Sequence, residues 1–172
     1  MLPRQVMSYG QLLRSGLKEN EIYNMYAALK IFPTPFKGIY YIPSKEERDS
    51  WSIEKPLLIL ARAIALFLRN DDFYYSCRTA EEFWGLKWQP AGETHIVNEK
   101  ISDRIEIKDR VGRNIKKTTF RAKKIAKILE LYGNEIILHK VKSIKDAKIK
   151  ETPYGRFAFK SQIKKDKKRF RN

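Results

Sequence analysis

A short amphipathic helix predicted near the N-terminus constrains this chain of 172 residues more than any other feature. Its apolar side chains recur at a spacing of three and four residues, at Ile22, Met25, Tyr26 and Leu29. This spacing places them on one side of an α-helix, which must then pack against a core. Gly16 suits the left-handed turn that ends a shorter helix around residues 11–13. The pattern predicts two helices joined by a tight turn.

A β-hairpin is expected directly after the second helix. Residues 33–35 contain two prolines that break the helical pattern, Lys37-Gly38 suits a tight corner, and Ile39–Ile42 has strand composition. Two helices followed by a hairpin predict a winged helix-turn-helix. The alternative is a small α/β module without a nucleic-acid partner, because the pattern alone separates the two poorly.

The outer face of the second helix supplies candidate DNA-binding residues. In helix-turn-helix proteins, the N-terminal residues of the second helix contact base edges in the major groove. The candidates are Lys18, Asn20, Glu21 and Asn24, together with Lys37 in the hairpin. Asparagine is a suitable partner for adenine. The acids Glu19 and Glu21 argue against strong phosphate contact at the helix start, where they also suit the helix dipole.

The rest of the chain predicts a second, mixed domain, so the fold class is α+β. We expect domains at residues 1–50 and 51–160, with a polar linker or a short solvated helix at 44–51. A basic tail at 161–172 is either disordered or the start of a helix. Residues 54–70 are apolar enough for the central helix of the second domain. Further helices are predicted from Thr79 to Gly85 and from Thr119 to Tyr132. Strands are predicted at 73–77, 95–97, 104–108, 135–142 and 156–160, the second and third of them paired.

Positive charge is concentrated in the last third of the sequence. The net charge is +16, and residues 101–172 alone carry 23 basic and 8 acidic side chains. Segregated positive charge favours a polyanionic partner through counterion release, and the alternative is a lysine-rich solubility coat. The basic residues outside the apolar stripe of the helix at 119–132 and in the loop before it are Lys116, Lys117, Arg121, Lys123, Lys124 and Lys127. We expect double-stranded DNA to contact this face.

Catalytic and metal-binding signals are weak. Cys77 is the only cysteine and is expected to be a buried thiol, while His95 and His139 stand isolated in the sequence. We therefore expect no metal, no cofactor and no enzymatic activity. A magnesium-dependent nuclease using Glu106 and Lys108, with Asp103 or Glu93 as a further acid, is a weaker alternative. The absence of a long apolar run and of a signal-peptide core predicts a cytoplasmic protein without membrane contact.

Two stretches resemble the AbiEi family of type IV toxin–antitoxin antitoxins, which are winged-helix transcriptional regulators. The first runs from the Ser15-Gly16-Leu17 hinge to Gly-Ile-Tyr-Tyr-Ile-Pro at 38–43, and the second covers residues 74–86. The resemblance implies a regulator that represses its own operon and counters a nucleotidyltransferase-like toxin without a stable complex. Chains of that family run on into further helices, whereas this sequence is shorter at its C-terminus.

An alternative reading assigns the basic surface to RNA or to a structural role in a nucleoprotein. Charge and shape alone suffice to bind RNA, so composition does not separate DNA from RNA. The operator sequence and the oligomeric state have no signature in the sequence.

Overall fold

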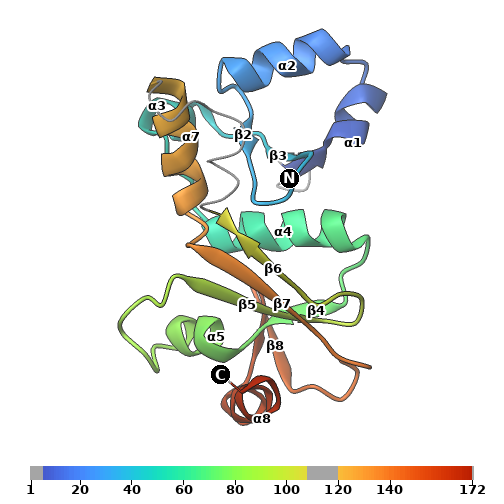
Figure 1. Ribbon diagram of the computed structural model, residues 1–172, viewed down its shortest axis with the longest axis vertical. Helices are drawn as coiled ribbons and strands as arrows, with labels where there is room; N and C mark the ends of the chain where they lie inside the picture. The colour runs from blue at the N-terminus through green and yellow to red at the C-terminus, as the bar shows by residue number, and fades with distance from the viewer. Residues whose placement is uncertain (1–5, 108–119, 172) are drawn as a thin grey trace. The chain divides into compact units, whose positions relative to one another are not determined.

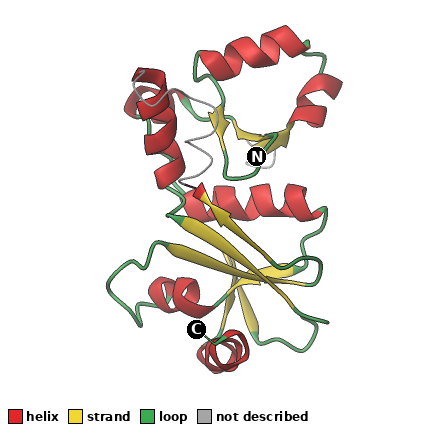
Figure 2. Cartoon of the chain, viewed as in Figure 1, coloured by secondary structure: helices red, strands yellow, loops and turns green. Residues whose placement is uncertain are grey.

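Short strands and seven helices alternate along the part of the chain that the computed structural model describes, residues 6–107 and 120–171. The architecture is mixed α+β with two separate sheets (Figures 1 and 2). The chain divides into two units, the first built from Met1–Asn70 and Lys108–Tyr132 and the second from Asp71–Ile107 and Gly133–Asn172. Within the described residues, no helix is both long and apolar enough to cross a membrane.

The first unit contains a three-stranded antiparallel sheet in the order β1-β3-β2. Its strands are β1 (Val6–Ser8), β2 (Phe32–Pro33) and β3 (Ile39–Tyr41). Ser8 ends β1 and also caps the next helix, because its hydroxyl oxygen accepts the backbone N–H of Gln11 at 3.1 Å. The Gln11 side chain in turn accepts the N–H of Ser8 at 2.9 Å. This reciprocal pair satisfies two backbone donors at the helix start.

Two helices follow β1, namely α1 (Tyr9–Arg14) and α2 (Glu19–Ala27). Gly16 lies between them with a φ of +101°, as the sequence predicts for this turn. The helices pack on a cluster centred on the buried residues Leu12, Ile22 and Ile31. Met25 and Tyr26 contact this cluster, which confirms the predicted stripe for these positions. Leu29 lies beyond the end of α2 with a φ of +54°, so the stripe does not extend through it.

Helices α3 (Lys45–Ser50), α4 (Pro56–Leu68) and α7 (Phe120–Glu130) also belong to the first unit. Pro56 occupies the first turn of α4, as predicted. The expected domain boundary near residue 50 differs from the observed division. Helix α4 contacts β1 and β3, and α7 contacts β2, so both belong to the first unit. The apolar composition of a helix predicts that it is buried, but it does not predict against which unit the helix packs.

Of the two forms expected for residues 44–51, the structure confirms the short helix, α3, which is attached to the first unit through one buried side chain. Glu47 is buried, and its carboxylate accepts the hydroxyl of Tyr41 at 2.6 Å and the backbone N–H groups of Ser44 and Glu54, both at 3.0 Å. A buried carboxylate is tolerated when donors surround it. Burial and the neighbouring Glu47 carboxylate raise the pKa of Tyr41 well above its usual value, so the phenol remains a donor.

The second unit contains a six-stranded mixed sheet in the order β6-β7-β5-β4-β9-β8. Its strands are β4 (Phe73–Tyr75), β5 (Glu93–Asn98), β6 (Asp103–Glu106), β7 (Glu135–Lys140), β8 (Ile149–Thr152) and β9 (Gly155–Ala158). The expected pairing of the strands at 95–97 and 104–108 is wrong, because β7 lies between β5 and β6. Strand β7 runs parallel to β5 and antiparallel to β6, so both of its edges are paired within the sheet.

Helices α5 (Cys77–Phe83) and α8 (Lys160–Phe170) contact each other and strand β9 of the second unit (Figure 1). Ser76 precedes α5, so the predicted start at Thr79 is wrong; Thr79 lies inside the helix and is buried. Of the two forms expected for the basic segment at 161–172, the structure confirms the helix. Gln162, Ile163 and Asp166 of α8 are buried, which makes this helix part of the core of the unit.

Candidate functional site

The outward face of α2 carries the polar residues expected to contact DNA. Lys18, Asn20, Glu21 and Asn24 are all exposed, and Tyr23 between them is 65 % exposed. They are exposed because Ile22, on the opposite side of the helix, is buried. The face therefore follows directly from the apolar period of the sequence.

Glu21 has a structural partner on this face. Its carboxylate accepts the backbone N–H of Lys18 at 2.7 Å and so caps the start of α2. A carboxylate held in this way satisfies one of the unpaired donors at the helix start. A ligand contact of Glu21 would therefore compete with capping. The amides of Asn20 and Asn24 lie on the same exposed face of the helix.

Lys37 lies at the corner between β2 and β3 and is exposed. Gly38 follows with a φ of +75°, and its carbonyl accepts the N–H of Tyr9 at 2.7 Å, which ties the corner to the start of α1. The rings of Tyr26 on α2 and Tyr40 on β3 meet edge to face with centroids 5.8 Å apart. These contacts hold the hairpin and α2 in one arrangement.

Helix α7 presents part of the expected basic face. Lys123 and Lys127 are exposed and one helical turn apart, so they project from the same side. The ammonium of Lys124 instead lies 3.6 Å from the centre of the Trp51 ring, a cation–π contact within the first unit. Lys116 and Lys117 lie outside the described residues, and the side chain of Arg121 is likewise outside the description. The structure therefore describes Lys123 and Lys127 as the exposed cations of this face.

The division into units distributes the positive charge differently from the order of the sequence. The ranges that form the first unit contain 19 basic and 8 acidic residues, and those of the second contain 17 and 12. The excess is therefore 11 in the first unit and 5 in the second. The expected second domain, residues 51–160, took in most of this charge because it included residues 108–132, which belong to the first unit. The unit that carries α1, α2 and the hairpin is the more basic one.

Two acids of the nuclease alternative, Asp103 and Glu106, do not share one face of the sheet. Asp103 and Glu106 are both exposed on the edge strand β6, three positions apart, and side chains at that separation point to opposite faces of a strand. Glu93 forms a contact of 3.0 Å with a ring nitrogen of His95 instead. Lys108 lies outside the described residues.

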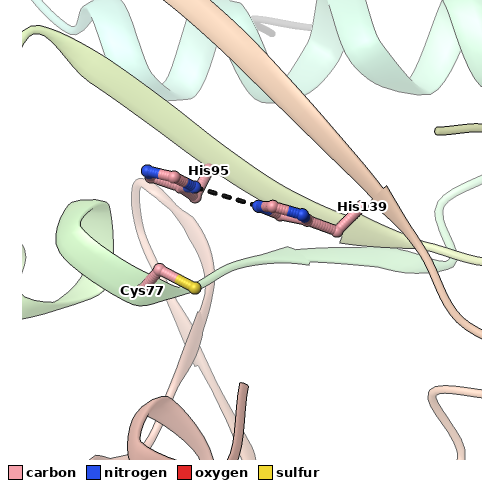
Figure 3. Close-up of side chains that lie close together, drawn as sticks. All are labelled: Cys77, His95 and His139. Carbon is pink, nitrogen blue, oxygen red and sulfur yellow. Dashed lines mark hydrogen bonds between the residues drawn. The ribbon is translucent and has the colours of Figure 1, made fainter. Parts of the chain in front are cut away.

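A cluster of Cys77, His95 and His139 was missed in the sequence, where each histidine looked isolated. The thiol sulfur and one ring nitrogen of each histidine all lie within 4.8 Å of one another (Figure 3). Cys77 begins α5, His95 lies on β5 and His139 on β7. The parallel register pairs Val97 with His139, which makes His95 and His139 diagonal neighbours on one face of the sheet. Knowing that β5 pairs with β7 would have shown that the two histidines lie close together.

Burial sets the charge state of the two imidazoles. Burial, together with the nearby His95 and Arg104, lowers the pKa of His139 to about 4. Burial also lowers the pKa of His95, against the opposing effect of the Glu93 carboxylate. Both rings are therefore neutral near neutral pH, the form in which imidazole donates a lone pair.

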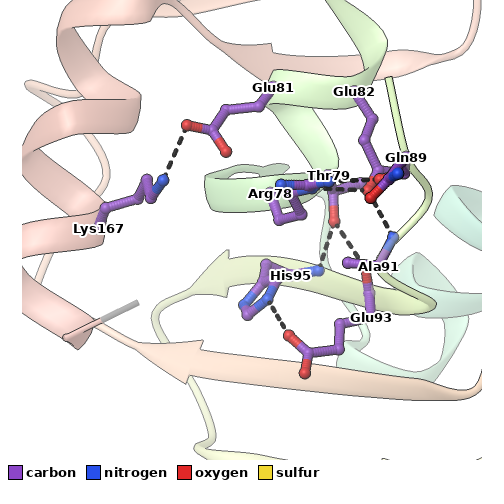
Figure 4. A network of polar contacts seen from close by, with 9 residues as sticks. All are labelled: Arg78, Thr79, Glu81, Glu82, Gln89, Ala91, Glu93, His95 and Lys167. Carbon is purple, nitrogen blue, oxygen red and sulfur yellow. Dashed lines mark hydrogen bonds and ion pairs between the residues drawn. The ribbon is translucent and has the colours of Figure 1, made fainter. Parts of the chain in front are cut away.

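A polar network fixes the position of His95 (Figure 4). The Thr79 hydroxyl oxygen accepts the backbone N–H of His95 at 2.7 Å, and the Glu93 carboxylate lies 3.0 Å from its Nε2 atom. On the neighbouring helices, Lys167 of α8 forms an ion pair of 2.9 Å with Glu81 of α5. These contacts connect β5, α5 and α8 around the cluster.

Comparisons with known proteins assign no family, since no family model, curated protein or solved structure matches the chain.

Proposed function

We propose that the protein is a sequence-specific DNA-binding transcriptional regulator of the AbiEi antitoxin type. In this proposal, β1, α1, α2 and the β2–β3 hairpin form a winged helix-turn-helix. The observation that carries it is the exposed polar face of α2, which follows a tight turn at Gly16 and is anchored by the buried Ile22. A recognition helix needs this combination of an anchored apolar side and a free polar side.

The charge of the first unit supports the same proposal. Base contacts give sequence preference, while contacts between cations and phosphates give most of the affinity. Asn20 and Asn24 are placed for the first task, and Lys37, Lys123 and Lys127 for the second. The resemblance to AbiEi antitoxins adds repression of its own operon and functional opposition to a nucleotidyltransferase-like toxin.

The decisive experiment compares binding of two duplexes by fluorescence anisotropy. One duplex covers the region upstream of the protein's own gene, and the other has the same composition in scrambled order. Replacing Asn20 and Asn24 with Ala should lower the ratio of specific to non-specific affinity at least about 30-fold, because each of the two lost base contacts costs about 1 to 3 kcal/mol. Asn134→Ala, which changes an exposed asparagine of the second unit, is the matched control.

Two results would argue against the proposal. If the double variant weakens both duplexes equally, α2 does not read bases. If a structured RNA displaces the upstream duplex at equal concentration, the basic surface is an RNA-binding surface instead. The antitoxin role is tested separately, by whether co-expression of the protein relieves growth arrest caused by a toxin gene next to its own.

A further inference from the structure

We infer that Cys77, His95 and His139 form a binding site for a transition-metal cation, with Zn²⁺ the best fit. The site lies within the second unit and is independent of the proposed DNA-binding function. Its three donors come from α5, β5 and β7, so the fold of the unit brings them together.

The donor types select the class of cation. One sulfur and two imidazole nitrogens form a borderline to soft set, which suits Zn²⁺, Co²⁺ or copper and is unsuited to Mg²⁺ or Ca²⁺. Zn²⁺ accepts such mixed sets in tetrahedral geometry, with bonds of about 2.3 Å to sulfur and 2.0–2.1 Å to nitrogen. Three protein ligands leave a fourth position for water or another small ligand.

The distances agree with a site that is nearly formed. Tetrahedral bonds of these lengths require ligand atoms about 3.4 Å apart between nitrogens and about 3.6 Å apart between nitrogen and sulfur. Nδ1 of His95 and Nε2 of His139 are 2.9 Å apart, and all three donor atoms lie within 4.8 Å. Binding therefore needs the imidazole rings to separate by a few tenths of an ångström and the thiol to approach by about one ångström or less.

Glu93 prepares His95 for this role. Its carboxylate lies 3.0 Å from Nε2 of His95, and because a carboxylate oxygen accepts hydrogen bonds, this contact holds the proton on Nε2. Nδ1 is then left with a lone pair directed at the cluster. Without metal, that lone pair accepts the Nε2–H of His139. With metal, His139 must carry its proton on Nδ1 instead, and Nε2 becomes the second nitrogen ligand. A carboxylate behind a histidine ligand is a common feature of zinc sites.

Aromatic and backbone contacts close the cluster from other sides. The ring of Phe170 at the end of α8 stacks on His139 with centroids 4.0 Å apart and an interplanar angle of 14°. The backbone N–H of His95 is held by Thr79. Cys77 and His95 are almost fully buried. Binding would release the thiol proton, since the thiolate is the ligand form of cysteine.

The test uses the full chain without a histidine tag, stripped of metal by a chelator and then titrated with Co²⁺. We expect one equivalent to bind, with visible bands of tetrahedral cobalt and a near-ultraviolet sulfur-to-cobalt charge-transfer band that Zn²⁺ abolishes. Cys77→Ser should remove the charge-transfer band, and His139→Asn should weaken binding at least about tenfold. Glu93→Ala should weaken it about 10- to 100-fold while keeping the band, because Glu93 only orients a ligand. Asp103→Asn, an exposed carboxylate of the same unit, is the control and should change nothing.

A second measurement covers variants that fold poorly. Zn²⁺ should raise the Tm of the parent protein in a concentration-dependent way, because a ligand that binds only the folded state stabilises it. The Cys77→Ser variant differs from the parent by one atom, and its Tm should not rise when Zn²⁺ is added. An unchanged Co²⁺ spectrum in Cys77→Ser, or no stoichiometric binding by the folded parent, would overturn the inference and leave the cluster as a hydrogen-bonded histidine pair beside a buried thiol.

Discussion

Replacing Asp166 with Ala should strongly destabilise the second unit, although this residue lies in a segment whose composition resembles a solvated tail. Asp166 is fully buried on α8. Its carboxylate accepts three hydrogen bonds, from the Ser76 hydroxyl at 2.6 Å, from the Gln162 amide at 2.8 Å and from the Tyr74 hydroxyl at 3.0 Å. Two of these donors belong to the strand β4 and the residue after it, so the carboxylate joins α8 to the sheet.

The expected loss follows from the three donors that the substitution leaves without an acceptor. A hydrogen bond to a charged group contributes about 1.5 to 3 kcal/mol, and removing one side of a buried charged network typically costs about 3 to 5 kcal/mol in total. We expect the free energy of unfolding of the second unit to fall by about 3 to 5 kcal/mol. Asp166→Asn should lose less, because it keeps one acceptor oxygen. Lys165→Ala, an exposed neighbour on the same helix, should stay within about 0.5 kcal/mol of the parent.

Urea unfolding, followed by the fluorescence of Trp84, measures the free energy of unfolding of the second unit. The Trp84 indole donates to the carbonyl of Ala158 at 2.8 Å, so its emission reports on the contact between α5 and β9. Trp51 and Trp88, the other two tryptophans, are replaced with Phe in all variants so that only Trp84 contributes. If the midpoint of Asp166→Ala equals that of Lys165→Ala, the carboxylate does not hold α8 and the reasoning fails.

The remaining predictions concern the second core and the basic face of α7. Tyr75→Ala should cost about 3 to 5 kcal/mol, because the ring is fully buried with its centroid 4.9 Å from that of Phe157; a loss below about 1 kcal/mol in the Trp84 assay would contradict the placement of β4. Replacing Lys123 and Lys127 together with Ala should lower the slope of log affinity against log salt by up to about 2, since each phosphate contact contributes about 0.9. Anisotropy across a salt series measures that slope, and an unchanged value would show that these two cations only solvate the helix.

Local features of the fold could be predicted because they depend on neighbours in the sequence. The turn at Gly16, the start of α4 at Pro56 and the apolar stripe of α7 through Ile125, Ile128 and Leu129 are all confirmed. Each follows from the backbone conformations that glycine or proline allows, or from the 3.6-residue period of a helix. Both depend on only a few neighbouring residues. The exposed face of α2 is of the same kind.

Long-range features could not be predicted in the same way. Strand β7 separates β5 from β6, and α4 joins the first unit, because pairing and packing partners depend on the whole fold. The cluster of Cys77, His95 and His139 depends on the same pairing, so it was missed as well. For α8, a local signal did exist: Gln162, Ile163 and Asp166 lie on one helical side, but the many basic neighbours concealed it.

The return of the chain to its first unit at residues 108–132 has a consequence for synthesis on the ribosome. Ile125, Ile128, Leu129 and Tyr132 are buried in that unit, yet they are made after residues 71–107 of the second unit. The nascent N-terminal segment must therefore wait for later residues before its core is complete, and during that interval the apolar surface of β2 that α7 contacts stays uncovered. A shortened product ending near residue 70 would carry the whole predicted recognition face but would be a target for chaperones and proteases.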